Sequence, residues 1–217
     1  EFVLASDVLG LSSLVDMLHS DPASTSSSVL GPFHVSGAPP LAVGGDMKRD
    51  FGGPMLLAEG VIRDTDGNPI ANAEIDIWQT APNGLYASQD DAQDTFSFHG
   101  LMTVGKDGRY AFTTVKPVEY TVPTNGPVGD ILRACGRHPH LHYIVKAPGF
   151  KTLVTEVFPQ DDPYLDQDTV FGVRDDLVMT YEHKQPDDFP GGMVLSGQVH
   201  DPFLYVNFDV TLARIPA

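Results

Sequence analysis

The residues most able to do chemistry in this sequence are two histidines, His140 and His142, at the head of an apolar run that ends at Val145. Side chains two residues apart on a β-strand point to the same face. Both imidazoles can therefore reach one point while Leu141 faces the opposite way. Neutral imidazole binds iron, zinc, copper and nickel, so the pair is half of a metal site. The competing interpretation is a pair of surface or core histidines without a ligand.

Two tyrosines follow the ends of other predicted strands. Tyr86 comes after the strand that ends at Trp78, and Tyr120 comes after the strand that ends at Val115. Loops held by a rigid sheet often carry functional residues, although a lone tyrosine is more often a packing residue. A phenol has a pKa of about 10, which a highly charged cation lowers. Two phenolates with two imidazoles would suit ferric iron, unlike the carboxylate set of ferrous oxygenases or the sulfur-rich zinc sites.

Short strands dominate the chain beyond residue 55. Apolar runs separated by Gly, Pro and Asp-Gly turns predict strands over residues 55–62, 73–78, 100–104, 110–115, 140–145, 153–158, 177–181 and 204–212. The Asp-Gly pair at 107–108 predicts a hairpin between the third and fourth of these. Helices do not alternate with the strands, so an all-β fold, an antiparallel β-sandwich, is expected.

The beginning of the chain has a different pattern. Apolar positions from Ser6 to His19 recur at helical spacing, with Ser6 or Asp7 available as N-cap. Residues 21–28 form a linker rich in serine, threonine and proline. The predicted division is therefore an N-terminal helix and linker over residues 1–28 and a β-sandwich domain over residues 29–217.

Composition narrows the choice of partners and compartment. The net charge of −16 excludes a basic footprint for nucleic acid and disfavours binding to anionic membranes. No apolar stretch reaches the ~20 residues that span a bilayer, and the first residues lack the pattern of a secretory signal. Cys135 is the only cysteine, which fits a reducing compartment. We expect a cytoplasmic protein with no nucleic-acid or membrane partner.

Together these motifs resemble the intradiol ring-cleavage dioxygenases, in the catechol and hydroxyquinol 1,2-dioxygenase branch. The resemblance covers nearly the whole chain, and the combination of motifs is specific although no single one is. It is carried by Ser6–Leu11, Val29–Val35, Ile77–Gln79, Gly84–Tyr86, Gly126–Gly129, Arg137-x-x-His140-x-His142, Asp162–Tyr164 and Val170–Val173. The stretches 30–35 and 126–129 are more similar to the hydroxyquinol enzymes than to the catechol enzymes.

The resemblance implies a mononuclear iron(III) centre with Tyr86, Tyr120, His140 and His142 as ligands. It also implies that a catecholic substrate binds this iron and that Tyr120 then leaves the metal and helps to take a substrate proton. Both atoms of O2 would enter the ring. Hydroxyquinol would give maleylacetate, and catechol would give a cis,cis-muconate.

Further roles follow from the same resemblance. Arg137 would stabilise negative charge on the reacting ring carbon, and the alternative is a structural arginine paired with a carboxylate. Val29, Pro32 and Trp78 would line the substrate. Two features depart from the family. About four residues fewer precede the two histidines, either because this loop is shorter or because a few residues are missing from the sequence, and Glu156 stands where relatives carry glutamine or histidine.

In the family, a larger helical region pairs two subunits, and residues 6–19 match its last helix. The resemblance therefore implies a homodimer through the N-terminal helix. Two other classes stay open. A non-catalytic β-sandwich binding module would bind no iron tightly. A zinc hydrolase using His140 and His142 would bind zinc and keep its activity in Tyr86→Phe or Tyr120→Phe.

Overall fold

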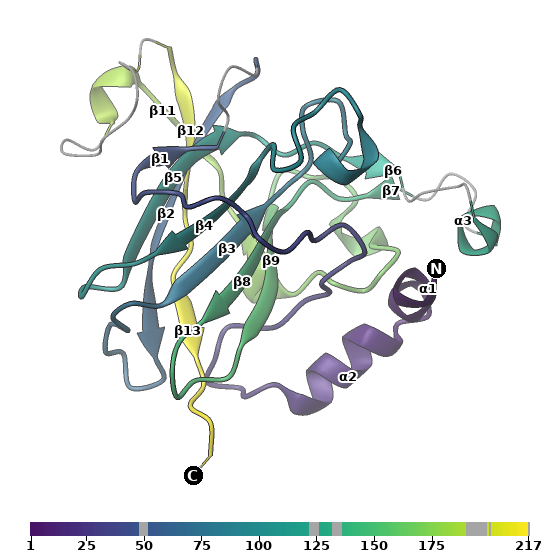
Figure 1. Ribbon diagram of the computed structural model, residues 1–217, viewed down its shortest axis with the longest axis horizontal. Coiled ribbons are helices and arrows are strands. Elements are labelled where there is room, and N and C mark those ends of the chain that lie inside the picture. Colours follow the sequence, from purple (N-terminus) through teal and green to yellow (C-terminus); the bar gives the residue numbers. More distant parts are fainter. Residues whose placement is uncertain (48–51, 122–125, 132–135, 190–198, 200, 217) are drawn as a thin grey trace.

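Two β-sheets form the framework of the computed structural model, which describes residues 1–47, 52–121, 126–131, 136–189, 199 and 201–216 (Figure 1). The first sheet has the spatial order β1 (Gly45–Asp46), β5 (Arg109–Val115), β2 (Met55–Asp64), β12 (Phe203–Asn207) and β11 (Glu182–Lys184), and β13 (Val210–Leu212) also pairs with β2. The second sheet has the order β10 (Val178–Met179), β9 (Leu153–Pro159), β8 (Leu141–Lys146), β3 (Glu74–Trp78) and β4 (His99–Thr103). A separate pair joins β6 (Tyr120–Thr121) to β7 (Gly136–Arg137).

The helices are short. They are α1 (Phe2–Val8), α2 (Leu11–His19) and α3 (Pro127–Ile131), with 3₁₀ turns η1 (Ala87–Gln89), η2 (Leu165–Gln167), η3 (Asp175–Leu177) and η4 (Pro186–Asp188). Across the described residues, no single helix is long and apolar enough to cross a membrane, and only α1 and α2 taken together, bent by 73°, reach that length and composition.

One hydrophobic core lies between the two sheets. It contains Leu56 and Phe112 from the first sheet and Ile77, Tyr143 and Val157 from the second, and each of these five is fully buried. The alternate residues of β3 and β8 face away from this core. The strand-rich architecture expected from the sequence is therefore confirmed, and it leaves an outer face on the second sheet.

Three details of the predicted fold are wrong. The sheets are mixed and not antiparallel, because β1–β5, β2–β12, β2–β13 and β9–β10 pair in parallel. The Asp107-Gly108 turn makes no hairpin, since β4 and β5 belong to different sheets. The helix expected over residues 6–19 is two helices, broken where Gly10 takes a left-handed φ of 71°.

The last two predicted strands also differ from the structure. Residues 204–212 form two strands, β12 and β13, separated at Phe208 and Asp209. Residue 177 belongs to η3, so that only Val178–Met179 is extended there. The remaining six predicted strands agree with the structure to within two residues at each end.

The segment that follows α2 crosses the outer face of the second sheet, as the dark segment in Figure 1 shows. The Ser28 N–H donates to the Val154 carbonyl of β9 at 2.9 Å, and the Leu101 N–H of β4 donates to the Pro39 carbonyl at 2.9 Å. Between these two points His34 contacts Asp76 of β3. Residues 28–39 therefore cover the face on which the candidate residues lie.

Candidate metal centre

One row of cross-strand neighbours carries several of the candidate residues. Across β9, β8, β3 and β4 the register pairs Glu156 with His142, His142 with Trp78, and Trp78 with His99. Residues directly opposite one another in a sheet point to the same face. Four adjacent strands therefore present a carboxylate, two imidazoles and an indole side by side on the outer face of the second sheet.

The four predicted ligands converge above this row. The Tyr86 Oη lies 3.3 Å from the Tyr120 Oη, 3.3 Å from the His140 Nε2 and 3.0 Å from the His142 Nε2. The two Nε2 atoms lie 3.0 Å apart. All four side chains are at least nine-tenths buried. The structure thus brings together the four residues proposed as metal ligands.

Local turns place the two tyrosines. Tyr86 follows a turn in which Gly84 has a φ of 76°, and the Gly84 N–H donates to the Ala81 carbonyl at 2.9 Å. A Cβ added at Gly84 would lie 3.3 Å from the Glu119 carbonyl oxygen, so glycine lets this turn approach the strand that carries Tyr120. Tyr120 pairs directly with Arg137 across β6 and β7.

Burial controls the protonation of all four ligands. Burial, with the positive charge of Arg137, lowers the pKa of His140 well below its usual range, and burial beside His140 does the same for His142. Burial beside Tyr120 raises the pKa of Tyr86 well above 10. Burial also raises the pKa of Tyr120, against the opposing charge of Arg137. Neutral imidazole is the form that binds metal, and a bound cation removes the proton of a coordinated group.

The histidine hydrogen bonds fit a metal ion. The His140 Nδ1 lies 2.6 Å from the His138 carbonyl oxygen, which can only accept, so Nδ1 carries the proton and Nε2 presents its lone pair. The buried His142 Nδ1 makes no hydrogen bond among the described residues, but it lies 3.5 Å from the Glu156 Oε1. Two imidazole nitrogens and two phenol oxygens aimed at one point form a donor set for a transition metal.

Arg137 makes a buried ion pair beside this centre. Its Nη1 and Nη2 donate to the two carboxylate oxygens of Glu156 at 2.9 and 3.2 Å, and its Nε lies 3.6 Å from the Asp168 Oδ1. Burial opposes ionisation of Glu156, but several interactions, led by the charge of Arg137, together hold the pKa of Glu156 below its usual value. The Glu156 Oε1 also lies 3.2 Å from the His140 Nε2. Arg137 therefore pairs with a carboxylate, as expected for a structural arginine. It also lies next to Tyr120.

The three residues predicted to line the substrate are placed differently. Trp78 is buried and its ring stacks on His142, with centroids 4.5 Å apart and an interplanar angle of 3°. Val29 lines a cavity of about 420 Å³ against α1 and α2, whereas Pro32 is exposed. Tyr120 and Arg137 line a different cavity of about 760 Å³. Val29 and Tyr120 thus border different cavities, and contact of Val29, Pro32 and Trp78 with a substrate stays a prediction.

One aromatic contact was not singled out by the sequence. The Phe33 ring stacks on Tyr86, with centroids 4.6 Å apart, and meets Tyr120 edge-on at 6.4 Å. Neighbouring Gly31 has a left-handed φ of 69°, and a Cβ there would lie 3.9 Å from the His142 Cε1. The only feature of the sequence that could have pointed to this contact was the position of Phe33 within the motif 29–35.

Comparison with known proteins gives consistent matches. The family model described as Dioxygenase matches residues 31–213. The hydroxyquinol 1,2-dioxygenase of Rhizobium sp. (strain MTP-10005) is 45% identical over 221 residues, covering 99% of this chain and 74% of that protein. The structure of hydroxyquinol 1,2-dioxygenase from Pseudomonas putida DLL-E4 matches with a TM-score of 0.89 and 37% identity, over 99% of this chain and 76% of that one. The structure of catechol 1,2-dioxygenase from Acinetobacter sp. ADP1 matches with a TM-score of 0.88 and 29% identity, over 100% of this chain and 74% of that one.

Proposed function

Because the chain belongs to the intradiol ring-cleavage dioxygenase family, we propose that it cleaves the ring of hydroxyquinol (1,2,4-trihydroxybenzene) between its adjacent hydroxylated carbons to give maleylacetate. Both atoms of O2 enter the product. The observation that carries this proposal is the convergence of the Tyr86, Tyr120, His140 and His142 donor atoms in a chain of this family. The same donors count against a zinc hydrolase, which would leave the two tyrosines without a role.

The ion that suits these donors is iron(III). Two phenolates are hard anionic ligands and two neutral imidazoles complete the set, so a trivalent ion is neutralised more fully here than a divalent one. When bound, the ion supplies a Lewis acid that binds the diol as its anion and activates the ring toward O2. Tyr86, Tyr120, His140 and His142 would hold it.

Side chains at and around the ligands would transfer a proton, stabilise charge and exclude water. Tyr120, which pairs with Arg137 across β6 and β7, would accept a proton from the substrate diol through its phenolate oxygen. Arg137 supplies a fixed positive charge for negative charge that develops on the substrate, a type of interaction that strengthens in a water-poor site. Trp78 and Phe33 pack their rings against His142 and Tyr86 and exclude water from the ligands.

The chain organisation follows the same proposal. We infer that residues 29–217 form a catalytic β-sandwich, which the family match to residues 31–213 and the core shared by the two sheets support. Residues 1–28, with α1 and α2, would belong to a helical region that pairs two copies of the chain. A cytoplasmic location stays a prediction from the single cysteine of this chain.

A substrate comparison tests the proposal. We expect the iron-loaded protein to consume O2 with hydroxyquinol, to place both atoms of ¹⁸O2 in the product, and to show a kcat/KM at least about tenfold higher than with catechol, the equivalent of about 1.4 kcal/mol for one recognised hydroxyl. A preference for catechol, with a cis,cis-muconate as product, would favour the alternative activity that the Acinetobacter sp. ADP1 enzyme is named for. Absence of O2 uptake from an iron-loaded sample with either diol would contradict both.

A further inference from the structure

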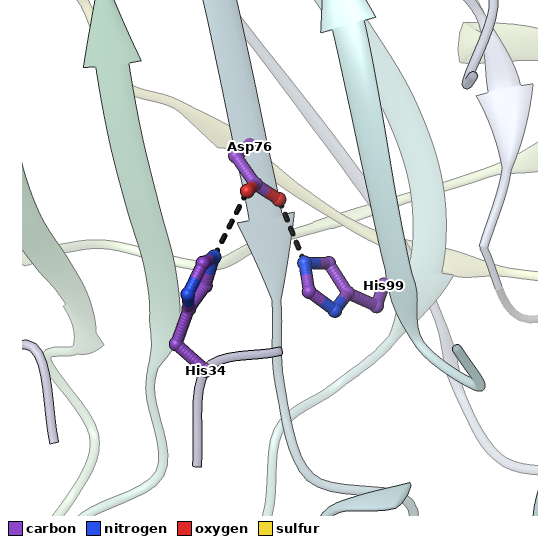
Figure 2. A group of neighbouring side chains, drawn as sticks. All are labelled: His34, Asp76 and His99. Atoms are coloured by element: carbon purple, nitrogen blue, oxygen red, sulfur yellow. Dashed lines mark hydrogen bonds and ion pairs between the residues drawn. The ribbon is translucent and has the colours of Figure 1, made fainter. Parts of the chain in front are cut away.

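A second group of donor atoms lies beside the metal centre on the same face of the second sheet. The group consists of His34 from the crossing segment, Asp76 from β3 and His99, the first residue of β4 (Figure 2). Asp76 and Trp78 lie two residues apart on β3, and His99 pairs with Trp78 across β3 and β4. Alternation therefore puts all three side chains of the sheet on its outer face.

Both imidazoles contact the Asp76 carboxylate. The His34 Nε2 lies 2.9 Å from the Asp76 Oδ2, and the His99 Nε2 lies 2.7 Å from the Asp76 Oδ1. One ligand atom from each residue lies within 4.8 Å of the others. Figure 2 shows the two rings approaching the carboxylate from either side, each with a nitrogen directed at it. Ligands about 2.0–2.2 Å from a tetrahedral zinc ion lie roughly 3.3–3.6 Å apart, so small rotations of these side chains would admit an ion.

The surroundings favour a charged carboxylate that solvent can reach. Burial raises the pKa of Asp76, but the hydrogen bonds from His99 and His34 outweigh it and hold the pKa below its usual value. The side chains of His34 and Asp76 are each 17% exposed, and that of His99 is 6% exposed. The group is therefore partly accessible to solvent.

We propose that His34, Asp76 and His99 bind one divalent transition-metal ion, with zinc as the best fit. Mg²⁺ and Ca²⁺ take oxygen ligands, which two imidazole nitrogens cannot supply. Two histidines and one carboxylate are a known zinc donor set, in which water fills the fourth position. On binding, each ring carries its proton on Nδ1 and turns the Nε2 lone pair toward the ion.

Trp78 keeps this site separate from the Tyr86 centre. Its ring stacks on His142 at 4.5 Å on one side and meets His34 edge-on, at 4.7 Å and 62°, on another. The two donor groups therefore share a neighbour but no ligand. Zinc binding at His34, Asp76 and His99 does not depend on the ring-cleavage activity, so failure of one proposal leaves the other standing.

The zinc content per chain is measured on iron-loaded protein, so that iron already fills the Tyr86 centre. The protein is dialysed against Zn²⁺ at about pH 7.5, and both metals are measured by plasma mass spectrometry. We expect one zinc per chain in addition to iron, and at least a tenfold loss of zinc affinity in His99→Ala and in Asp76→Asn. His183→Ala removes an exposed imidazole from β11 and serves as the matched control, with zinc binding unchanged.

Two results would overturn the proposal. If iron-loaded wild-type protein retains no zinc, the three side chains form only a structural hydrogen-bonded cluster. Zinc bound equally by wild type, His99→Ala and Asp76→Asn would mean that the ion lies elsewhere. Zinc-edge X-ray absorption of the wild type needs no variant to fold, and it must show two imidazole ligands and no sulfur. Fewer than two imidazoles would also contradict the site.

Discussion

At the scale of single residues, the chemistry of the centre depends on groups that are neutral until a cation arrives. Burial lowers the pKa of His140 and His142 and raises the pKa of Tyr86 and Tyr120, so the unliganded donors carry no charge near neutral pH. Neutral donors avoid the large cost of burying isolated charges. When a trivalent cation binds, only the two phenols lose a proton and become charged, and the two imidazoles stay neutral.

His142 is the ligand whose removal should have the clearest effect. Its Nε2 lies 3.0 Å from both the Tyr86 Oη and the His140 Nε2, so His142→Ala removes a central donor and leaves a gap beneath Trp78. We expect iron content to fall more than about tenfold, since even losses around a ligand typically cost 10–100-fold in affinity. Metal analysis measures this, with His183→Ala as the control. Full iron content in folded His142→Ala would contradict the ligand assignment.

Arg137 tests whether a buried ion pair also serves the reaction. Lysine keeps the positive charge but cannot make the two parallel hydrogen bonds to Glu156. We expect Arg137→Lys to keep its iron and to lose about 10²-fold in kcat, the usual size for a lost charge-stabilising donor. Steady-state O2 uptake measures the loss.

The matched control for that measurement is Arg109→Lys, because the Arg109 side chain is 70% exposed and lies at the start of β5. Its kcat should equal that of wild type. A folded Arg137→Lys protein with wild-type kcat would reduce Arg137 to the structural partner of Glu156.

At the scale of elements, the alternation of apolar and polar residues predicted which segments are strands and which side chains share a face. Runs such as 73–78 and 140–145 place alternate side chains on opposite faces, so the strands and the shared direction of His140 and His142 could be read from the sequence. Alternation is the same for parallel and antiparallel neighbours, which is why antiparallel sheets were expected although β12 runs parallel to β2. Apolar spacing also continues across Gly10, so the break between α1 and α2 was not predicted.

The rest of the site required long-range information. Tyr86 and Tyr120 lie in segments without periodicity, and the two-residue strands β6 and β7 are too short to leave a pattern. Their positions after predicted strand ends made the tyrosines candidates, and the family resemblance then assigned them as ligands. Glu156 was noted as a departure, but its pairing with Arg137 joins residues on different sheets and could not be inferred from either position. The donor group His34, Asp76 and His99 spans three separated segments in the same way.

A prediction at this scale concerns the turn that closes β2. The Asp64 Oδ1 accepts the backbone N–H of Asn68 at 2.9 Å and of Asp66 at 3.0 Å, and Oδ2 accepts from Arg214 Nη2 at 2.7 Å. The hydrogen bond from the Asn68 backbone holds the pKa of Asp64 below its usual value. A depressed folded pKa stabilises the protein above the unfolded value of about 3.9, and this stability is lost as the pH falls through the folded value.

Asp64→Asn should therefore unfold at a lower denaturant concentration than wild type near pH 7, and the difference should shrink as the pH falls below about 4. Urea unfolding at several pH values measures both midpoints. Asp66→Asn is the control, because the Asp66 side chain is exposed and only its backbone contacts Asp64. A difference that stays constant down to acid pH would assign the effect of Asp64→Asn to altered packing and not to charge.

At the scale of the whole molecule, the N-terminal helices leave an apolar surface uncovered. Its most exposed members are Phe2, Leu9, Leu11, Leu14, Met17 and Leu18, each more than half exposed. Large apolar patches of this kind mark interaction sites. We expect this chain to form a dimer at micromolar concentration through α1 and α2, and light scattering to give twice the monomer mass of 23.4 kDa.

The net charge of the chain adds a second test of dimerisation, which is its dependence on salt. Two copies that each carry a net charge of −16 repel one another, and added salt screens this repulsion without weakening apolar contacts. Dimerisation should therefore strengthen with NaCl, whereas an interface made of ion pairs would weaken. Leu14→Asp and Leu18→Asp should give monomers, while Ile215→Asp, an exposed apolar position near the C-terminus, should not. A wild-type mass of one chain at both low and high salt would exclude pairing through these helices in this chain.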